Sequence, residues 1–321
     1  MNKKIGIIVG ITVAAIIGGS VFLSKSGENN KKVETKQETI VVTDRKGDVT
    51  VPKDPEKVVV LDYSSLDTMS VMGEEAIAVP KSSLPTYLES YKDEKYVDLG
   101  SLKKFDMEKI NELDPDLIII EGRQEDSYDE LSKIAPTIML GKGQGSHFEV
   151  LENNVKILGQ IFDKEAEATE KLASIKSRTE AIAAKTKELT GKALVTMVYD
   201  GEISAFGAES RFGMIHNEFG FKQSDENIET ENHGQTVTSE YILSKNPDYL
   251  FVIDKGLISD KEQKPAKEII ENELVQKTNA YKNNGITYLD TKAWYLGGPG
   301  INATEKMLSE IEESVGIKAN K

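Results

Sequence analysis

Short apolar runs alternate with amphipathic stretches along most of the chain. Residues 40–51 read IVVTDRKGDVTV, two strand-like runs around a turn that ends in glycine, which predicts a small hairpin. The run VVVLDY at residues 58–63 is typical of a strand buried on both faces. Ser64 then offers an N-cap for an amphipathic helix that ends at Gly73. This order of strand, loop and helix predicts an α/β fold.

Two segments 132 residues apart share one pattern. Residues 110–123 read INELDPDLIIIEGR, and residues 242–255 read ILSKNPDYLFVIDK. Each predicts the end of a helix, a Pro-Asp turn and a buried strand. Arg123 and Lys255 occupy the same place, directly after the two strands. Because ligands bind outside the carboxyl ends of the strands in open α/β sheets, we expect both cations at a binding site.

Between the two repeats, apolar and small residues recur every three or four positions over residues 163–190, with Gly191 as a candidate C-terminal cap. This pattern predicts one long amphipathic helix. It divides the folded part of the chain into an amino-terminal α/β lobe, residues 39–162, and a carboxy-terminal α/β lobe, residues 191–321. We expect a cleft between the two lobes, walled by strand ends.

The composition removes several classes of function. The 321 residues carry 40 Lys and Arg against 54 Asp and Glu, a formal net charge of −14, without a long basic block, so nucleic-acid binding is disfavoured. The chain contains no cysteine, which excludes disulfides, thiolate metal sites, a cysteine nucleophile and a thioether-linked lipid. It also lacks the G-x-S-x-G, H-E-x-x-H, Walker and post-strand G-x-G-x-x-G motifs, so we expect no enzyme activity.

The first residues of the chain predict export. Two lysines precede an uncharged run at residues 5–23, which as a helix is long enough to span a bilayer. Residues 1–23 are therefore interpreted as an uncleaved membrane anchor or as a signal peptide cut near the small residues 18–20. The polar residues 24–38 are expected to form a flexible linker.

Seven blocks of sequence carry a family resemblance, at residues 96–102, 113–124, 132–140, 200–216, 232–242, 246–256 and 286–300. Over residues 40–316 the chain resembles the substrate-binding proteins of ABC transporters that import iron–siderophore complexes, in particular the catecholate type that includes petrobactin and enterobactin-type receptors. The resemblance implies two Rossmann-like α/β lobes joined by one rigid helix, the siderophore/cobalamin-type periplasmic-binding-protein fold.

The same resemblance implies a receptor that binds a ferric catecholate-type siderophore in the cleft and delivers it to an ABC permease. The ferric siderophore would be cargo, with no permanently bound cofactor. The receptor would be a monomer on the extracellular face of the cytoplasmic membrane, or secreted if residues 1–23 are removed. The alternatives are a haem or cobalamin receptor on the same scaffold and a membrane-tethered binding module without a role in transport. A zinc receptor is disfavoured because the chain has 3 scattered histidines.

Family positions for three cations that hold the anionic complex match Arg123, Arg211 and Lys255, the last of which replaces the usual arginine. Arginine suits catecholate oxygens because its planar guanidinium forms forked, charge-assisted hydrogen bonds. His233 and Tyr295 match the family's iron ligands, and they would fill two positions left open by a tetradentate siderophore. Trp294, the only tryptophan, is expected beside the ligand.

Carboxylates on the outer faces of the lobes are expected to dock to arginines of the permease. Asp67 in the first lobe and Glu218 in the second are the candidates, and ordinary solvated helix charges are the alternative. His147 and His216 are interpreted as a surface-loop residue and a helix residue without a role in binding.

Overall fold

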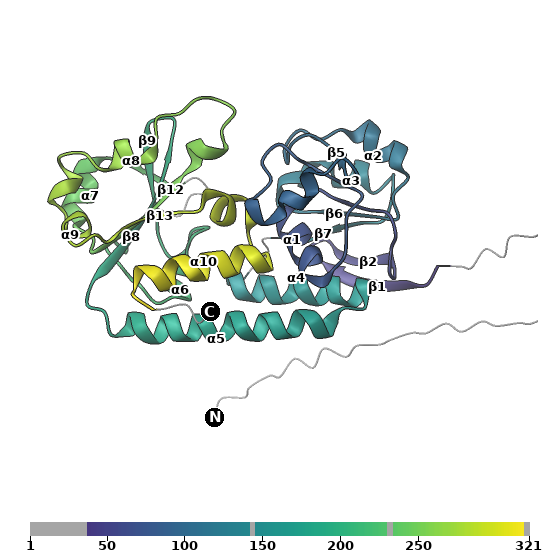
Figure 1. The fold of residues 1–321 in the computed structure, drawn as a ribbon, viewed down its shortest axis with the longest axis horizontal. Coiled ribbons are helices and arrows are strands. Elements are labelled where there is room, and N and C mark those ends of the chain that lie inside the picture. The colour runs from purple at the N-terminus through teal and green to yellow at the C-terminus, as the bar shows by residue number, and fades with distance from the viewer. Residues whose placement is uncertain (1–36, 142–144, 230–233, 318–321) are drawn as a thin grey trace, which may run out of the picture. The chain divides into compact units, whose positions relative to one another are not determined.

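Two large sheets and a separate two-stranded hairpin, with helices packed around them, make up the folded unit (Figure 1). The computed structural model describes residues 37–141, 145–229 and 234–317. The predicted hairpin is present as β1 (Thr39–Asp44) and β2 (Gly47–Pro52). Asp44 Oδ1 accepts hydrogen bonds from the backbone N–H groups of Lys46 and Gly47, and a φ of 124° explains the glycine at the turn. The predicted α/β class is confirmed.

The first sheet is fully parallel, in the order β5-β4-β3-β6-β7. Most of its strands come from apolar runs that are buried on both faces, as in Leu117–Ile120, whereas the edge strand Val97–Asp98 is partly exposed. The strands are β3 (Val58–Val60), β4 (Ala78–Val79), β5 (Val97–Asp98), β6 (Leu117–Ile120) and β7 (Thr137–Met139). The helical segments with them are α1 (Tyr63–Met72), η1 (Thr86–Lys92), α2 (Met107–Leu113), η2 (Gly122–Ser127), α3 (Tyr128–Leu131) and α4 (His147–Phe162).

The second sheet is mixed, in the order β11-β9-β8-β12-β13, with β10 also paired to β8. Strands β8, β12 and β13 are parallel, and β9 is antiparallel to both β8 and β11. The strands are β8 (Lys192–Tyr199), β9 (Glu202–Phe206), β10 (Lys222–Gln223), β11 (Gln235–Val237), β12 (Tyr249–Asp254) and β13 (Ile286–Leu289). The helical segments with them are α6 (Met214–Asn217), α7 (Ser239–Lys245), η3 (Lys255–Ile258), α8 (Ala266–Ile270), η4 (Val275–Lys277), α9 (Asn279–Lys282) and η5 (Lys292–Gly297).

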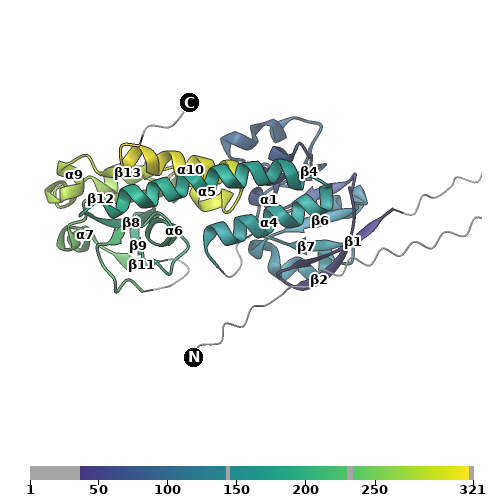
Figure 2. The same ribbon diagram turned by 90° about the horizontal axis from the view of Figure 1, so that it is seen from below.

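Two long helices run across both sheets, side by side in Figures 1 and 2. Helix α5 (Glu165–Lys187) lies within the predicted range 163–190, and α10 (Ile301–Ser314) packs against both α5 and α1. One hydrophobic cluster includes Val60 of β3, Ile182 of α5, Phe251 of β12 and Ile311 of α10. The predicted long helix is thus present, and one apolar cluster joins it to both sheets.

The internal repeat has a structural cause. Asp116 Oδ2 accepts hydrogen bonds from the backbone N–H groups of Glu56 and Lys57, just before β3, at 3.0 and 2.8 Å. Asp248 Oδ2 likewise accepts a hydrogen bond from the backbone N–H of Lys192, at the start of β8, at 2.9 Å. Each Pro-Asp turn thus ties the beginning of one strand to the beginning of its parallel neighbour, and the strands end at equivalent edges.

Two predicted helix caps are wrong. Asp62, and not Ser64, caps α1, because its carboxylate accepts hydrogen bonds from the backbone N–H groups of Ser64 and Ser65 at 2.9 Å. Gly191 does not end the long helix, which stops at Lys187. At Gly191 a Cβ would lie 2.8 Å from Cβ of Asp248, so glycine permits close packing there.

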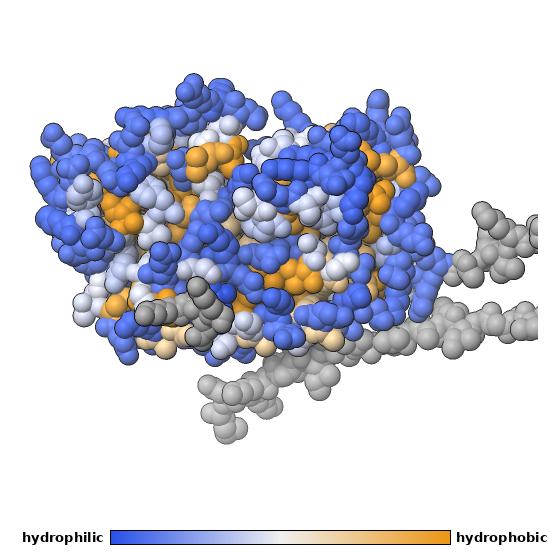
Figure 3. All heavy atoms as spheres, viewed as in Figure 1, coloured by the Kyte–Doolittle hydropathy of each residue, from blue (hydrophilic) through white to orange (hydrophobic). Residues whose placement is uncertain are grey.

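The surface in Figure 3 is mostly hydrophilic with scattered apolar patches. Among the described residues, none of the helices combines the length and the hydropathy needed to cross a bilayer. The predicted anchor at residues 1–23 and most of the linker at residues 24–38 lie outside the described residues.

Candidate ligand-binding site

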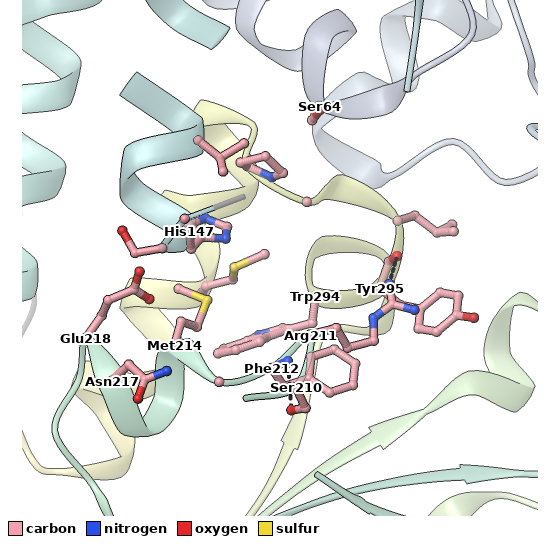
Figure 4. Close-up of a pocket in the computed structure, with 18 of the residues that line it drawn as sticks. Ser64, His147, Ser210, Arg211, Phe212, Met214, Asn217, Glu218, Trp294 and Tyr295 are labelled. Atoms are coloured by element: carbon pink, nitrogen blue, oxygen red, sulfur yellow. Dashed lines mark hydrogen bonds between the residues drawn. The ribbon is translucent and has the colours of Figure 1, made fainter. Parts of the chain in front are cut away.

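Two adjoining cavities lie at the carboxyl ends of the central strands. The first, with a volume of about 490 Å³, is lined by Arg123, Arg211 and Trp294, and we call it the arginine cavity (Figure 4). The second, of about 400 Å³, is lined by lysines 103, 104, 255 and 261, and we call it the lysine cavity. Arg123, Tyr295 and Leu296 line both cavities. The predicted position of the site at the strand ends thus coincides with observed cavities.

Tyr295 lies at the centre of the site because of an unusual backbone. Residues Lys292–Gly297 form a π-helical turn, a distortion that occurs frequently at functional sites. In this turn the carbonyl oxygen of Tyr295 accepts a hydrogen bond from Arg123 Nη2 at 2.8 Å and another from Arg211 Nη2 at 3.0 Å. The two arginines come from segments that follow β6 and β9, one in each sheet. The turn therefore holds cations from both sheets together.

The side chain of Tyr295 also has cations beside it. The Arg211 guanidinium carbon lies 4.0 Å from the centre of the Tyr295 ring. Lys255 Nζ lies 5.4 Å from the same ring centre and 4.1 Å from the ring centre of Tyr199. The three cations that the resemblance implied, Arg123, Arg211 and Lys255, thus gather around one tyrosine.

Burial and mutual repulsion shape the charges of this site. Burial lowers the pKa of Arg123, and the neighbouring charge of Arg211 lowers it further. Burial also lowers the pKa of Arg211. Burial raises the pKa of the Tyr295 phenol, but Arg211, Lys255 and Arg123 together outweigh it, so that this pKa lies below the ordinary value for tyrosine. Positive charge is therefore concentrated here, within an acidic protein.

The two arginines differ in their partners. Arg123 forms an ion pair with Glu121, whose side chain is 13% exposed. Among the described residues, Arg211 has no carboxylate within 4.0 Å; its contacts include the Tyr295 carbonyl and the ring of Phe212. The charge of Arg211 is thus the less compensated of the two.

Trp294 lines the arginine cavity, although it is only 4% exposed. Its indole Nε1 donates a hydrogen bond to Glu310 Oε2 at 2.8 Å, which ties the π-helical turn to α10. The residue is thus positioned to report on anything that enters this cavity.

The predicted iron ligand His233 lies outside the described residues. The next residue, Gly234, has a φ of 76°, and a Cβ there would lie 2.7 Å from the carbonyl oxygen of Ala205. The glycine after His233 thus has a left-handed conformation that a residue with a side chain rarely adopts. In the described part of the chain, His, Asp and Glu side chains form no group of three or more that could hold a metal ion.

Asp67 is not on an outer face, so the docking prediction does not fit this structure. The residue is fully buried. Its carboxylate accepts hydrogen bonds from Asn302 Nδ2 at 2.7 Å and from the backbone N–H of Ala303 at 2.9 Å. Asp67 of α1 therefore caps the amino end of α10, and its carboxylate cannot reach another protein.

Glu218 also differs from the prediction of an outward-facing carboxylate. The residue directly follows the short helix α6, which spans Met214–Asn217. Glu218 Oε1 accepts a hydrogen bond from the backbone N–H of Phe148 in the first turn of α4, at 3.4 Å, and Oε2 is buried. Burial raises the pKa of this carboxyl. The side chain thus bridges from the segment after α6 to α4.

His147 is the residue that the sequence interpretation missed. It is the first residue of α4 and not part of a surface loop, and it lines the arginine cavity. Its Nε2 lies 2.9 Å from Thr304 Oγ1 of α10. Ser146 and Glu149 form a capping box, and this sequence pattern could have predicted that a helix begins at His147. His216 lies in α6, as interpreted, with Nδ1 3.0 Å from the carbonyl oxygen of Phe221.

Known proteins resemble this chain over almost its whole length. It is 42% identical to the petrobactin-binding protein YclQ of Bacillus subtilis over 98% of this chain and 99% of that protein. The crystal structure of YclQ matches with a TM-score of 0.83, covering 87% of this chain and 99% of that one.

Two further relatives come from Vibrio. The chain is 32% identical to the ferric-anguibactin-binding protein FatB of Vibrio anguillarum over 85% of this chain and 86% of that protein. The periplasmic catecholate-siderophore binding protein VctP of Vibrio cholerae is 36% identical, with a TM-score of 0.81, 86% of this chain covered and 100% of that one. The periplasmic binding protein model matches residues 58–293, and the chain therefore belongs to the periplasmic binding protein family.

Proposed function

We propose that this protein is the extracytoplasmic receptor of an ABC transporter and binds a ferric catecholate-type siderophore. The observation that carries the proposal is the convergence of Arg123, Arg211 and Lys255 on Tyr295. The lobes at residues 39–162 and 191–321 would enclose the cargo. The role is binding without catalysis.

Charge explains why this arrangement suits such a cargo. Ferric iron is a hard cation held by oxygens, and a ferric catecholate complex carries excess negative charge. Guanidinium groups form forked, charge-assisted hydrogen bonds to such oxygens and stay charged at physiological pH. The buried positive charge of Arg211, which has no carboxylate within 4.0 Å among the described residues, is unfavourable without an anion, so a bound anion stabilises it.

The names of the relatives support the same class of cargo. YclQ is named for petrobactin, FatB for ferric anguibactin and VctP for catecholate siderophores. We do not favour the haem or cobalamin alternative, because a site with three convergent cations suits a compact anionic complex.

We further propose that Tyr295 and His233 complete the iron coordination when the siderophore leaves two positions open. The lowered pKa of the Tyr295 phenol supports this role, because a phenolate is the form that binds ferric iron. With a tetradentate ferric catecholate, Tyr295→Phe should abolish the tyrosinate charge-transfer band. An unchanged spectrum would remove Tyr295 from the iron's coordination shell.

The membrane arrangement is also a proposal. Residues 5–23 are uncharged and follow two lysines, so we propose that they hold the receptor at the outer face of the cytoplasmic membrane. Delivery of the cargo to a permease by a monomeric receptor belongs to the same proposal. Full-length chain should sediment with membranes, and a chain that begins at residue 24 should stay in the supernatant.

The central test is a titration followed by the fluorescence of Trp294. Ferric bis-catecholate and tris-catecholate complexes should quench it at low concentration, whereas ferric hydroxamate and haem should require far more ligand. The iron-free siderophore serves as the control for absorption by the ligand itself. Equal affinity for haem, or no response to any ferric catecholate, would reject the proposed function.

A further inference from the structure

The lysine cavity has a charge that its surroundings do not compensate. Lys103 and Lys104 lie in a turn after β5, closed by a bridge between Gly100 and Phe105. Lys255 and Lys261 approach from the other sheet, in and after η3. The cavity thus takes two ammonium groups from each side.

These lysines lack acidic partners in the part of the chain that the structure describes. None of the four ammonium groups has a carboxylate within 4.0 Å. Asp260 is the sole acidic residue among those that line the cavity in the described ranges. In a chain with 54 acidic residues, this local excess of positive charge calls for an anion from outside.

The chemistry of the lysine cavity differs from that of the arginine cavity. The guanidinium groups of Arg123 and Arg211 are fixed by their bonds to the Tyr295 carbonyl. Lys103, Lys104 and Lys261 are exposed, and their ammonium groups sit on flexible stems with three donors each. Serine residues 82, 83, 101 and 259 also line the cavity. Such a set suits a carboxylate whose position varies, and not a rigid iron complex.

We propose that the lysine cavity is a subsite for a free carboxylate of the cargo, one that does not bind iron. This inference rests on the proposed function, because the arginine cavity must hold the ferric catecholate end. On a chelator whose backbone carries a carboxylate that is not an iron ligand, this group stays anionic when the catecholate oxygens hold the iron, and it is free to bind the ammonium groups of the lysine cavity. The cavity next to Tyr295 is where such a backbone would extend.

The test compares two ferric bis-catecholate ligands with the same iron-binding groups. One carries a free backbone carboxylate, and in the other this carboxylate is capped as a methylamide. Both are titrated against Trp294 fluorescence with wild-type protein, K103Q/K104Q and K261Q. The matched control is K133Q/K277Q, which removes one exposed lysine from each sheet's side and none from either cavity. Neither lysine has a carboxylate within 4.0 Å among the residues that the structure describes.

For the carboxylate ligand, K103Q/K104Q should lose about tenfold in affinity and K261Q several-fold, the size expected for charge-assisted hydrogen bonds. For the methylamide ligand, all variants should have the affinity of wild type. The control variant should have wild-type affinity for both ligands.

Three results would overturn the subsite. Wild-type protein that binds both ligands equally has no carboxylate site. If K103Q/K104Q loses equal affinity for both ligands, the lysines act only through the overall charge of the protein. An equally large loss of affinity in K133Q/K277Q would lead to the same conclusion. If wild-type protein binds neither ferric ligand, the proposed function itself fails, which separates the two failures.

Discussion

Arg123 and Arg211 donate hydrogen bonds to the same atom, the backbone carbonyl oxygen of Tyr295, at 2.8 and 3.0 Å. The two residues are 88 positions apart in the chain and follow strands of different sheets. One carbonyl carries only a partial negative charge, so it orients the two guanidinium groups without neutralising them. The site is thus preorganised for an anion before any ligand arrives.

Removing either arginine should weaken the binding of a ferric catecholate by about 10 to 100-fold, the range expected for hydrogen bonds to a charged group. We expect this for Arg123→Gln and Arg211→Gln in the fluorescence titration. Arg45→Gln, which removes an exposed arginine outside both cavities, should leave the affinity unchanged. Wild-type affinity in both site variants would place the ligand elsewhere.

The same two variants should differ in stability. Arg123→Gln leaves Glu121 largely buried without its counter-charge, so the free energy of unfolding should fall by about 2 kcal/mol. Arg211→Gln removes a buried charge without a carboxylate partner among the described residues, so this free energy should stay the same or rise. Urea unfolding without ligand measures the free energy of unfolding of both variants. An equal decrease in both would contradict the conclusion that, among the described residues, only Arg123 of the two arginines has a carboxylate partner.

The Tyr295 phenol should titrate at a lower pH than an ordinary tyrosine. Burial alone raises its pKa, and the net decrease comes from Arg211, Lys255 and Arg123. Lys255→Gln should therefore move this titration to higher pH in an ultraviolet difference experiment, with Tyr295→Phe identifying the step. Lys133→Gln, an exposed lysine outside both cavities, is the control and should not move it. If the titration of Tyr295 occurs at the same pH in Lys255→Gln as in wild type, the charge of Lys255 does not lower this pKa.

Asp67 should make stability depend on pH. Burial raises the pKa of its carboxyl to about 7, against an ordinary value of 3.8, although Ala303 and Asn302 donate hydrogen bonds to it. The folded state therefore holds this proton more tightly than the unfolded chain. Its contribution to stability is full below about pH 4, falls as the pH rises to about 7 and is constant above that.

Comparison with Asp67→Asn isolates this contribution. An asparagine keeps an acceptor for the N–H of Ala303 and cannot ionise. From pH 5 to pH 8 the wild-type protein should lose stability relative to Asp67→Asn, by about 3 kcal/mol, because only the two pH units between 5 and about 7 contribute. Urea unfolding at the two pH values measures the difference. A difference that is independent of pH would show that Asp67 does not titrate in this range.

Arg178 and Glu312 join α5 to α10 through two hydrogen bonds, Nε to Oε1 at 2.9 Å and Nη2 to Oε2 at 2.8 Å. The Glu312 side chain is 7% exposed, so Arg178→Met should strand a buried carboxylate and cost about 3 kcal/mol. Arg178→Met/Glu312→Met should recover most of this loss. The more exposed pair of Lys171 and Glu305 is the control, and Lys171→Met should cost less than about 1 kcal/mol. If Arg178→Met and the double variant lose the same free energy of unfolding, an unpaired Glu312 carboxylate is not the cause of the loss.

Local patterns in the sequence account for much of the fold. Apolar runs predicted strands such as β3 and β6, because strands buried on both faces need continuous apolar sequence. The Pro-Asp repeat predicted equivalent strand ends, and Arg123 and Lys255 follow those strands as expected. Caps were less predictable: Ser64 and Asp62 both suit an N-cap, and only the path of the backbone selects Asp62.

The sequence by itself therefore determined the α/β order and the two cations of the repeat, because both depend on residues close together in the chain. Only the tertiary structure decided that Arg211 meets Arg123 at Tyr295, that His147 lines the cavity, and that Asp67 is buried. These relationships depend on how α1, α4 and α10 pack across the two sheets. Such packing joins residues that are far apart in the chain, by 84 positions for Arg211 and Tyr295 and by 236 for Asp67 and Ala303, and no local periodicity encodes it.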